Sequence, residues 1–381
     1  MLFRSARAQL HQLLQAMVES KASDMFVVAG APVSFKIDGL MHPVTQQNMM
    51  PAMTRQLAET LLSEAQLAEF NRCHEFNLAY SIAALGRFRV NLFIQRNSVG
   101  MVIRTINTSI PEINSLGLPE IVKQLILEKR GLILVVGGTG SGKSTSLAGM
   151  IGYRNQQTQG HIITIEDPIE FIHAHGKSII TQREVGTDTE SFAVALKNTL
   201  RQAPDVILIG EVRSRETMEH AITFAETGHL CLSTLHANNA NQALDRIINF
   251  FPEERKAQLL MDLSLNLKAI ISQRLIPKQT GKGRVAAIEV LINSPRMADL
   301  IFSGQVHEMK GVMMENRDMG MQTFDQSLFD LYESNQISYT DALRFADAVN
   351  DLRLRIKLSS HRFAQEQPDA SIQDGISSFE L

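Results

Sequence analysis

The sequence of 381 residues contains no tryptophan and only two cysteines, Cys73 and Cys231. Two isolated thiols fit neither a disulfide framework nor a zinc-ligand spacing, and they are typical of a reducing cytoplasm. No apolar run reaches the ~18 residues that a membrane-spanning helix requires, so we expect none. The N-terminus also lacks the continuous apolar core of a secretory signal.

The sequence also lacks a large excess of positive or negative charge. It contains 37 Lys and Arg and 40 Asp and Glu, which gives a formal net charge of −3. Proteins that bind nucleic acids usually carry a basic field, so we expect no nucleic-acid partner. The length predicts two or three domains, with enough chain to bury a core.

The strongest chemical signal is a glycine-rich octet that matches the pattern G-x-x-x-x-G-K-[ST]. The octet is Gly137, Gly138, Thr139, Gly140, Ser141, Gly142, Lys143 and Ser144. It follows an apolar run at 132–136 and precedes a segment that favours a helix from Thr145 to Gly152. In a strand–turn–helix context, such a loop turns its backbone N–H groups toward a phosphate.

These residue types predict a nucleoside triphosphate site formed by residues 137–145, including Thr145. Lys143 would reach the β- and γ-phosphates, and Ser144 would ligate Mg²⁺. The alternative is a glycine-rich turn with a surface lysine.

Residues 1–112 are predicted to form a small α+β domain. An amphipathic first helix is indicated by helical spacing of Leu10, Leu13, Leu14, Met17 and Val18, with a membrane-surface helix as the alternative. Short strands at 25–28 and 33–37 and a helix at 53–70 follow.

Arginines line one face of the predicted sheet in this domain. Phe88, Val90 and Leu92 alternate with Arg87, Arg89 and Asn91, and a strand at 101–106 carries Arg104. A solvated strand face explains this pattern. The alternative is that Arg89 and Arg104 donate charge to a triphosphate held by another domain or subunit.

Residues 113–360 are predicted to form an α/β domain. Apolar runs at 132–136, 162–165, 206–209 and 230–235 alternate with helical patterns, which favours a parallel sheet covered on both faces. Past Asn241 we expect mostly helix, including one from Pro252 to about Leu275. Residues 361–381 are polar, and we expect a disordered tail.

Two carboxylates follow strands at the sheet edge where ligands bind, namely Glu166 and Glu211. One would hold Mg²⁺ through water, and the other would orient or deprotonate the attacking water; we favour Glu211 for the water. Asp205 precedes its strand, so we do not expect it to ligate a metal. His229 and His236 flank one strand, too far apart to share a metal, and a γ-phosphate-sensing role near the nucleotide edge is open.

Four motifs together resemble the hexameric secretion ATPases of type II secretion and type IV pili. They are the octet at 137–144, the acidic stretch TIEDPIEF at 164–171, LRQAPDVILIGEVR at 200–213, and the segment from ETGH to TLH at 226–236. The resemblance implies a PAS-like small domain, a RecA-like large one and a hexameric ring with ATP between the two domains. It also matches Arg89 and Arg104 to arginines that reach the nucleotide.

Within these ATPases the chain resembles the pilus retraction branch. The assembly and secretion members carry a four-cysteine zinc insertion, whereas this chain has only two cysteines. The stretch at 296–303 lacks the arginines and glutamate of the principal retraction motor's C-terminal motif, and Ser214 replaces its usual aspartate. These differences resemble an accessory member of the branch.

The resemblance implies a cytoplasmic, Mg²⁺-dependent ATPase that supports pilus retraction and twitching motility. Its expected partners are further copies of itself, a related retraction ATPase and the pilus platform protein of the inner membrane, at which it would act peripherally. One alternative is an ATP-binding adaptor with little hydrolysis of its own. A DNA translocase with a RecA-like core is disfavoured by the acidic balance.

Overall fold

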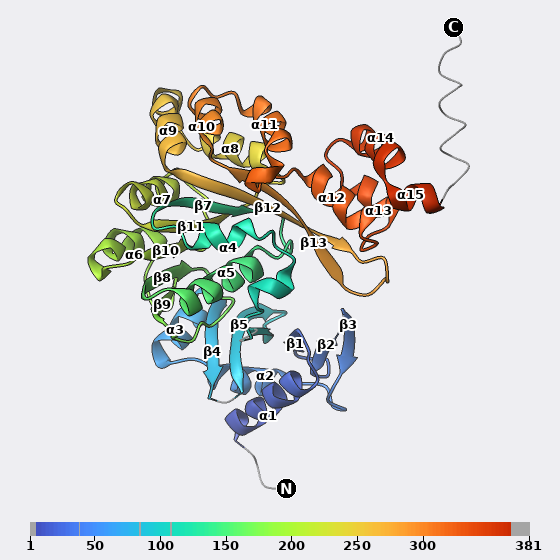
Figure 1. The fold of residues 1–381 in the computed structure, drawn as a ribbon. Coiled ribbons are helices and arrows are strands. Elements are labelled where there is room, and N and C mark those ends of the chain that lie inside the picture. Colours follow the sequence, from blue (N-terminus) through green and yellow to red (C-terminus); the bar gives the residue numbers. More distant parts are fainter. Residues whose placement is uncertain (1–4, 38, 84, 107–108, 367–381) are drawn as a thin grey trace. The chain divides into compact units, whose positions relative to one another are not determined.

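The computed structural model describes residues 5–37, 39–83, 85–106 and 109–366 (Figure 1). The chain divides into two compact units: residues 1–109 with 170–172 form unit 1, and residues 110–169 with 173–381 form unit 2. Unit 2 therefore begins three residues before the start predicted from the sequence.

Unit 1 is an antiparallel sheet of six strands in the order β3-β2-β1-β6-β5-β4. Its strands are β1 (Asp24–Val27), β2 (Ser34–Ile37), β3 (Leu40–Pro43), β4 (Glu75–Ile82), β5 (Gly86–Gln95) and β6 (Ser98–Ile106). Helix α1 (Ala6–Glu19) buries Leu10, Leu14 and Met17 completely in the core of unit 1. Its apolar stripe is therefore already used, which argues against the membrane-surface alternative.

The single helix predicted at 53–70 is wrong. Two helices, α2 (Pro51–Glu59) and α3 (Glu64–Cys73), occupy this region. The break occurs at Ser63, whose side chain accepts from Gln66 N while the Gln66 side chain accepts from Ser63 N. This capping box starts a new helix because it satisfies N–H groups that a continuous helix would have paired internally.

Unit 2 is built on a seven-stranded sheet in the order β13-β12-β7-β11-β10-β8-β9. Its strands are β7 (Gly131–Val136), β8 (Gly160–Glu166), β9 (Ser178–Glu184), β10 (Val206–Ile209), β11 (Leu230–Leu235), β12 (Leu267–Pro277) and β13 (Arg284–Ile292). All neighbouring pairs are parallel except β12 and β13.

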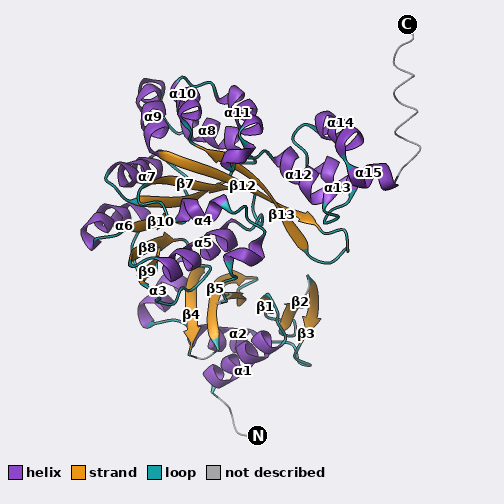
Figure 2. Cartoon of the chain, in the orientation of Figure 1, coloured by secondary structure: helices purple, strands orange, loops and turns teal. Residues whose placement is uncertain are grey.

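Helices cover both faces of this sheet, as the α/β prediction required (Figure 2). Along β7, Leu132, Leu134 and Val136 join one core, whereas Ile133 and Val135 join the other. The first core includes α6 (Phe192–Thr199), α7 (Arg215–Glu226), α8 (Ala240–Asn249), α9 (Glu253–Asn266), α10 (Pro295–Phe302) and α11 (Met309–Glu315). The second includes α4 (Ile121–Ile126) and α5 (Lys143–Gln157).

The C-terminal part of unit 2 differs from the prediction in two ways. The helix expected to reach Leu275 ends at Asn266, and the chain continues into β12 and its hairpin with β13. The tail expected from residue 361 begins with a helix, α15 (His361–Glu366), whereas residues 367–381 lie outside the described part. This region also contains α12 (Phe324–Glu333), α13 (Tyr339–Arg344) and α14 (Val349–Ser359), which pack on Ile276 and Ala287 of the hairpin.

None of the helices in the described ranges has the length and apolar character needed to cross a lipid bilayer.

Candidate nucleotide site

The glycine-rich octet forms the turn between β7 and α5. Gly142 caps α5 with φ +91°, a conformation that L side chains rarely adopt, and no side chain caps this helix. The first N–H groups of an α-helix have no partners within the helix, and the helix dipole makes that end partly positive. The start of α5 is therefore built to receive an anion.

Lys143 lies over the loop that it follows. Its Nζ donates to the carbonyl oxygens of Gly137, at 2.8 Å, and Gly138, at 2.9 Å, and the residue is 9 % exposed. The Ser141 hydroxyl is buried and has no hydrogen-bond partner among the described residues. A cationic group and an unsatisfied donor beside a helix N-terminus fit a bound phosphate group.

Ser144 and Thr145 lie half-buried in the first turn of α5. No group of three or more His, Cys, Asp or Glu side chains in the described ranges is arranged to hold a metal ion. A Mg²⁺ ion at Ser144 would therefore take most of its ligands from phosphate oxygens and water, which is its usual preference.

The two predicted carboxylates meet at one edge of the sheet. β8 ends at Glu166. β10 ends at Ile209, and Gly210 and Glu211 follow it directly. Gly210 N donates to Ile165 O at 2.8 Å, and a Cβ on Gly210 would lie 3.2 Å from Glu166 Cα. Both acids therefore stand at the carboxyl ends of adjacent strands, at the edge where the phosphate loop follows β7.

The two carboxylates have different partners. Thr164 Oγ1 donates to Glu166 Oε1 at 2.7 Å. Glu211 accepts from Arg213 Nε at 2.8 Å, and its Oε1 lies 3.3 Å from His236 Nε2. The hydrogen bond and charge of Glu211 raise the pKa of the Arg213 guanidinium.

The predicted position of His229 near the nucleotide edge is wrong. β11 runs parallel to β7, and Gly131 N, at the start of β7, donates to His229 O. His229 therefore lies at the opposite end of the sheet from the octet, where its Nδ1 is 3.2 Å from Phe224 O. A parallel strand brings only one of its ends to the ligand edge, and here that end leads to His236.

Arg89 and Arg104 face each other across β5 and β6 of unit 1. Arg104 Nε donates to Asp24 Oδ1 at 2.7 Å, although the Arg104 side chain remains 65 % exposed. Arg89 is exposed, and no described residue forms an ion pair with it. Arg104 is therefore occupied within unit 1, whereas Arg89 is available to another group.

Gln273 was missed because its segment was assigned to a helix. It lies on β12, is 4 % exposed, and accepts from Ser146 Oγ at 2.6 Å. The β-branched pair Ile270 and Ile271 is a weak strand signal in this segment.

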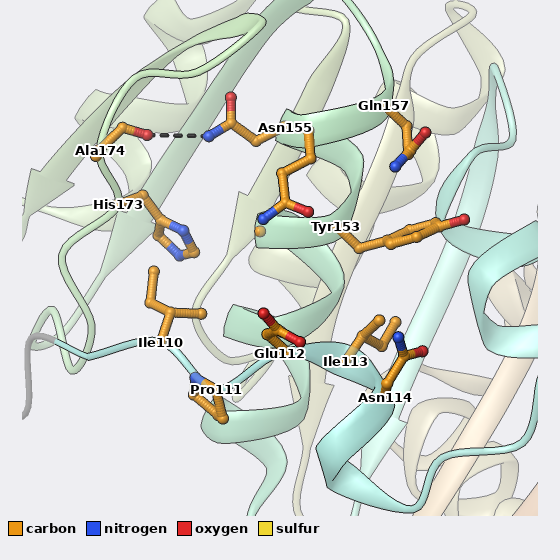
Figure 3. A pocket seen from close by; sticks show the side chains of 13 residues that line it. Ile110, Pro111, Glu112, Ile113, Asn114, Tyr153, Asn155, Gln157, His173 and Ala174 are labelled. Carbon is orange, nitrogen blue, oxygen red and sulfur yellow. Dashed lines mark hydrogen bonds between the residues drawn. The ribbon is translucent and has the colours of Figure 1, made fainter.

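A cavity of about 380 Å³ lies at the other end of α5 (Figure 3). It is lined by segments 110–114, 149–157 and 173–174, where burial lowers the pKa of His173 to about 4. At ~1.5 Å per helical residue this end is about 20 Å from Lys143, and the helix dipole there disfavours phosphate. The cavity is not the triphosphate site.

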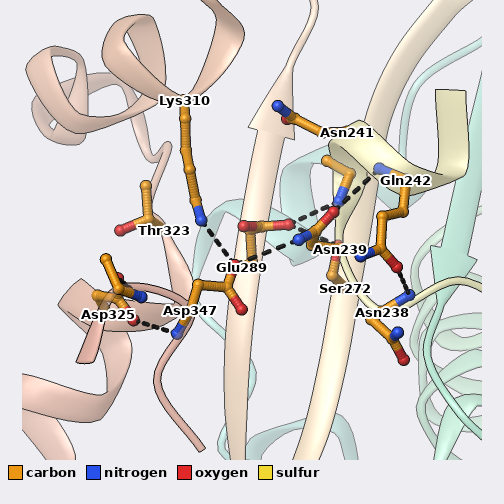
Figure 4. Close-up of polar contacts among 12 residues, drawn as sticks. Asn238, Asn239, Asn241, Gln242, Ser272, Glu289, Lys310, Thr323, Asp325 and Asp347 are labelled. Carbon is orange, nitrogen blue, oxygen red and sulfur yellow. Dashed lines mark hydrogen bonds and ion pairs between the residues drawn. The ribbon is translucent and has the colours of Figure 1, made fainter. Parts of the chain in front are cut away.

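A polar cluster holds the loop that carries His236 (Figure 4). Glu289 of β13 accepts from Ala240 N at 2.8 Å and from Ser272 Oγ at 2.9 Å. Asp347 accepts from Arg274 and Lys310, at 2.6 Å each, and from Asn239 Nδ2 at 3.2 Å. Arg274 also donates to Asn238 O, so this cluster jointly fixes residues 238–240, which follow His236 in the chain.

The family model for type II/IV secretion system proteins matches residues 4–328. The chain is 59 % identical to the type IV pilus ATPase PilU of Pseudomonas aeruginosa, over 97 % of this chain and 96 % of that protein. It is 40 % identical to the type IV pilus retraction ATPase PilT of the same organism, over 87 % and 96 % of the two chains.

The fold is also similar to a solved structure, a crystal structure of the pilus retraction motor PilT with bound ADP. The TM-score is 0.85 at 41 % identity, and the match covers 90 % of this chain and 98 % of that one.

Proposed function

This chain belongs to the family of type II/IV secretion system proteins, and on that premise we propose that it is an ATP-hydrolysing motor of the type IV pilus machine. The relative named PilU, aligned over nearly the whole chain, supports the pilus assignment, and the relative named PilT supports retraction as the direction of work. The observation that carries the proposal is the convergence of the 137–144 loop, Glu166 and Glu211 at one sheet edge.

In the proposed mechanism, residues 137–145 bind the phosphates of ATP, and Lys143 leaves its loop carbonyls to contact the β- and γ-phosphates. Bound Mg²⁺ would neutralise charge on the phosphate oxygens, with Ser144 as a ligand and Glu166 acting through water. Glu211 orients the attacking water or accepts its proton, while Arg213 and His236 hold the carboxylate. Arg89, and more weakly Arg104, would supply positive charge to the transferring phosphoryl group.

We further propose that the motor is a hexamer and works as an accessory to a related retraction ATPase. It would dock on the inner-membrane platform protein of the pilus machine from the cytoplasmic side. Nucleotide binding and release would then favour different arrangements of the two units, which converts hydrolysis into force.

The proposal is tested by phosphate release from the purified full-length chain, alone and together with the partner ATPase. Glu211→Gln is expected to keep ATP binding and to lose at least about a hundredfold in turnover, because it removes the proposed base. Lys143→Ala should lose ATP binding as well. The exposed Glu216→Gln is the matched control and should retain wild-type turnover.

Turnover of Glu211→Gln within about threefold of wild type would remove Glu211 from the mechanism. An ATP-binding adaptor is the second candidate, because the 296–303 stretch departs from the principal motor's motif and leaves Phe302 59 % exposed. The adaptor predicts that Glu211→Gln supports normal retraction in cells, whereas the motor predicts that it does not.

A further inference from the structure

Gln273 is buried beneath the phosphate loop and contacts both ends of it. Ser272 pairs with Val136 across β12 and β7, so Gln273 lies level with Gly137, the first residue of the octet. A Cβ on Gly137 would lie 2.6 Å from Gln273 O, which is closer than real Cβ contacts. The backbone of β12 therefore forms the wall against which the loop begins.

The side chain of Gln273 reaches the other end of the octet. A Cβ on Gly142 would lie 2.7 Å from Gln273 Nε2, so the amide occupies the space that any larger residue there would need. Gln273 Oε1 accepts from Ser146 Oγ at 2.6 Å, and Ser146 is 1 % exposed within the first turns of α5. One side chain thus bridges β12, the last glycine of the loop and the start of α5.

We propose that Gln273 is a positioning residue for the nucleotide site, an inference that rests on the proposed ATP-binding function. Glycine backbones have wide conformational freedom, so an unsupported loop samples arrangements whose N–H groups do not converge. The buried amide restricts Gly142 and anchors α5, which organises the N–H groups before phosphate arrives. Preorganised donors bind an anion more tightly because less order is lost on binding.

The inference is tested by calorimetric titration of full-length variants with MgADP. Gln273→Met removes the amide but conserves most of the volume, and its Kd is expected to rise about tenfold, with KM for ATP rising more than kcat falls. Gln326→Met is the matched control, because the Gln326 amide is also buried but accepts from Thr323 N and donates to Met314 O instead of contacting the loop. Its Kd should stay within about twofold of wild type.

Gln273→Glu adds a second measurement, the pH dependence of MgADP binding, which a purely structural role of Gln273 would not change. The carboxylate keeps an acceptor for Ser146 but places negative charge beside Gly142 and the phosphates. MgADP binding is therefore expected to weaken more at pH 8 than at pH 5.5, relative to wild type at each pH. This isosteric variant also serves if Gln273→Met fails to fold.

Wild-type affinity in folded Gln273→Met, or pH-independent wild-type affinity in Gln273→Glu, overturns the inference. Lys143→Ala distinguishes a failure of the positioning role from a failure of the proposed nucleotide site. If Lys143→Ala loses MgADP while the Gln273 variants keep it, only the positioning role is wrong. If Lys143→Ala also retains its affinity, the proposed nucleotide site itself is wrong.

Discussion

At the scale of single residues, the two strand-end carboxylates are suited to different tasks. Glu211 is held by the Arg213 guanidinium and lies beside His236, so its orientation is maintained. A carboxylate with a fixed orientation suits the positioning of a water molecule. Glu166 accepts from the Thr164 hydroxyl, an arrangement typical of a carboxylate that supports a metal-bound water. This difference supports the proposed division of roles.

The buried Glu289 is expected to make the free energy of unfolding depend on pH. Burial raises its pKa from 4.5 to about 7, against the lowering effects of hydrogen bonds from Ala240 N and Ser272 and of the Lys310 charge, while the Asp347 charge adds to the rise. The folded state therefore binds a proton that the unfolded state has already released. Proton binding by Glu289 therefore contributes fully to the unfolding free energy below pH 4.5. That contribution, about 3 kcal/mol, is lost as the pH rises from 4.5 to 7.

The measurement is urea unfolding of wild type and Glu289→Gln between pH 4.5 and 8. The neutral glutamine has no proton to lose, so its stability relative to wild type should increase as pH rises. The exposed Glu315→Gln is the control and should parallel wild type. A constant difference between wild type and Glu289→Gln across this range would contradict the raised pKa.

At the scale of elements, the sequence predicted the apolar parallel strands β7, β8, β10 and β11, but it did not predict β9 or β13. β10 has the predicted bounds because Pro204 and Asp205 precede it and Gly210 follows it. β12 was not predicted because residues 253–276 contain no glycine or proline to mark the end of α9, and apolar residues continue directly into the strand. The strand forms because pairing with β7 and β13 buries its residues on both faces, which is a tertiary effect. Missing β12 also hid Gln273 and Arg274.

Replacing Asp347 would measure how much the polar cluster contributes to holding β12 and the C-terminal helices together. Burial would raise its pKa, but the hydrogen bonds and charges of Lys310 and Arg274 lower the pKa below its ordinary value. Asp347→Ala leaves Arg274, whose side chain is 20 % exposed, without its carboxylate partner. We expect a loss on the order of 3 kcal/mol in unfolding free energy.

Hydrogen exchange should locate this loss in α12–α14 and in residues 238–240, which the cluster holds. The control is Glu315→Ala, which breaks an ion pair whose two side chains are 66 % and 64 % exposed. Its cost should stay below about 1 kcal/mol. Equal costs for the two variants, or faster exchange confined to other elements, would show that the cluster does not join these parts.

At the scale of the whole molecule, motifs predicted the α/β class of unit 2 and the α+β class of unit 1, because each depends on patterns within short segments. The ligand edge was predictable for the octet, Glu166 and Glu211, which all follow strands. The same rule could have placed His229 at the opposite end of the sheet, because His229, like Asp205, precedes its strand. Whether a nucleotide is shared between subunits depends on assembly, which no local pattern encodes.

Mixed assemblies test whether Arg89 acts on a nucleotide bound by another subunit. Lys143→Ala removes the phosphate lysine, and Arg89→Ala removes the exposed arginine of β5, so each variant alone should be nearly inactive. If sites form between subunits, about a quarter of the interfaces in an equal random mixture combine an intact loop with an intact arginine. Phosphate release should then recover to as much as about a quarter of the wild-type rate, since Arg89 has no described ion-pair partner that would hold it back. Mixing Lys143→Ala with Glu211→Gln is the control, because both residues belong to unit 2 and one subunit must supply both. If the Arg89 mixture stays as inactive as this control, the arginine does not act across subunits.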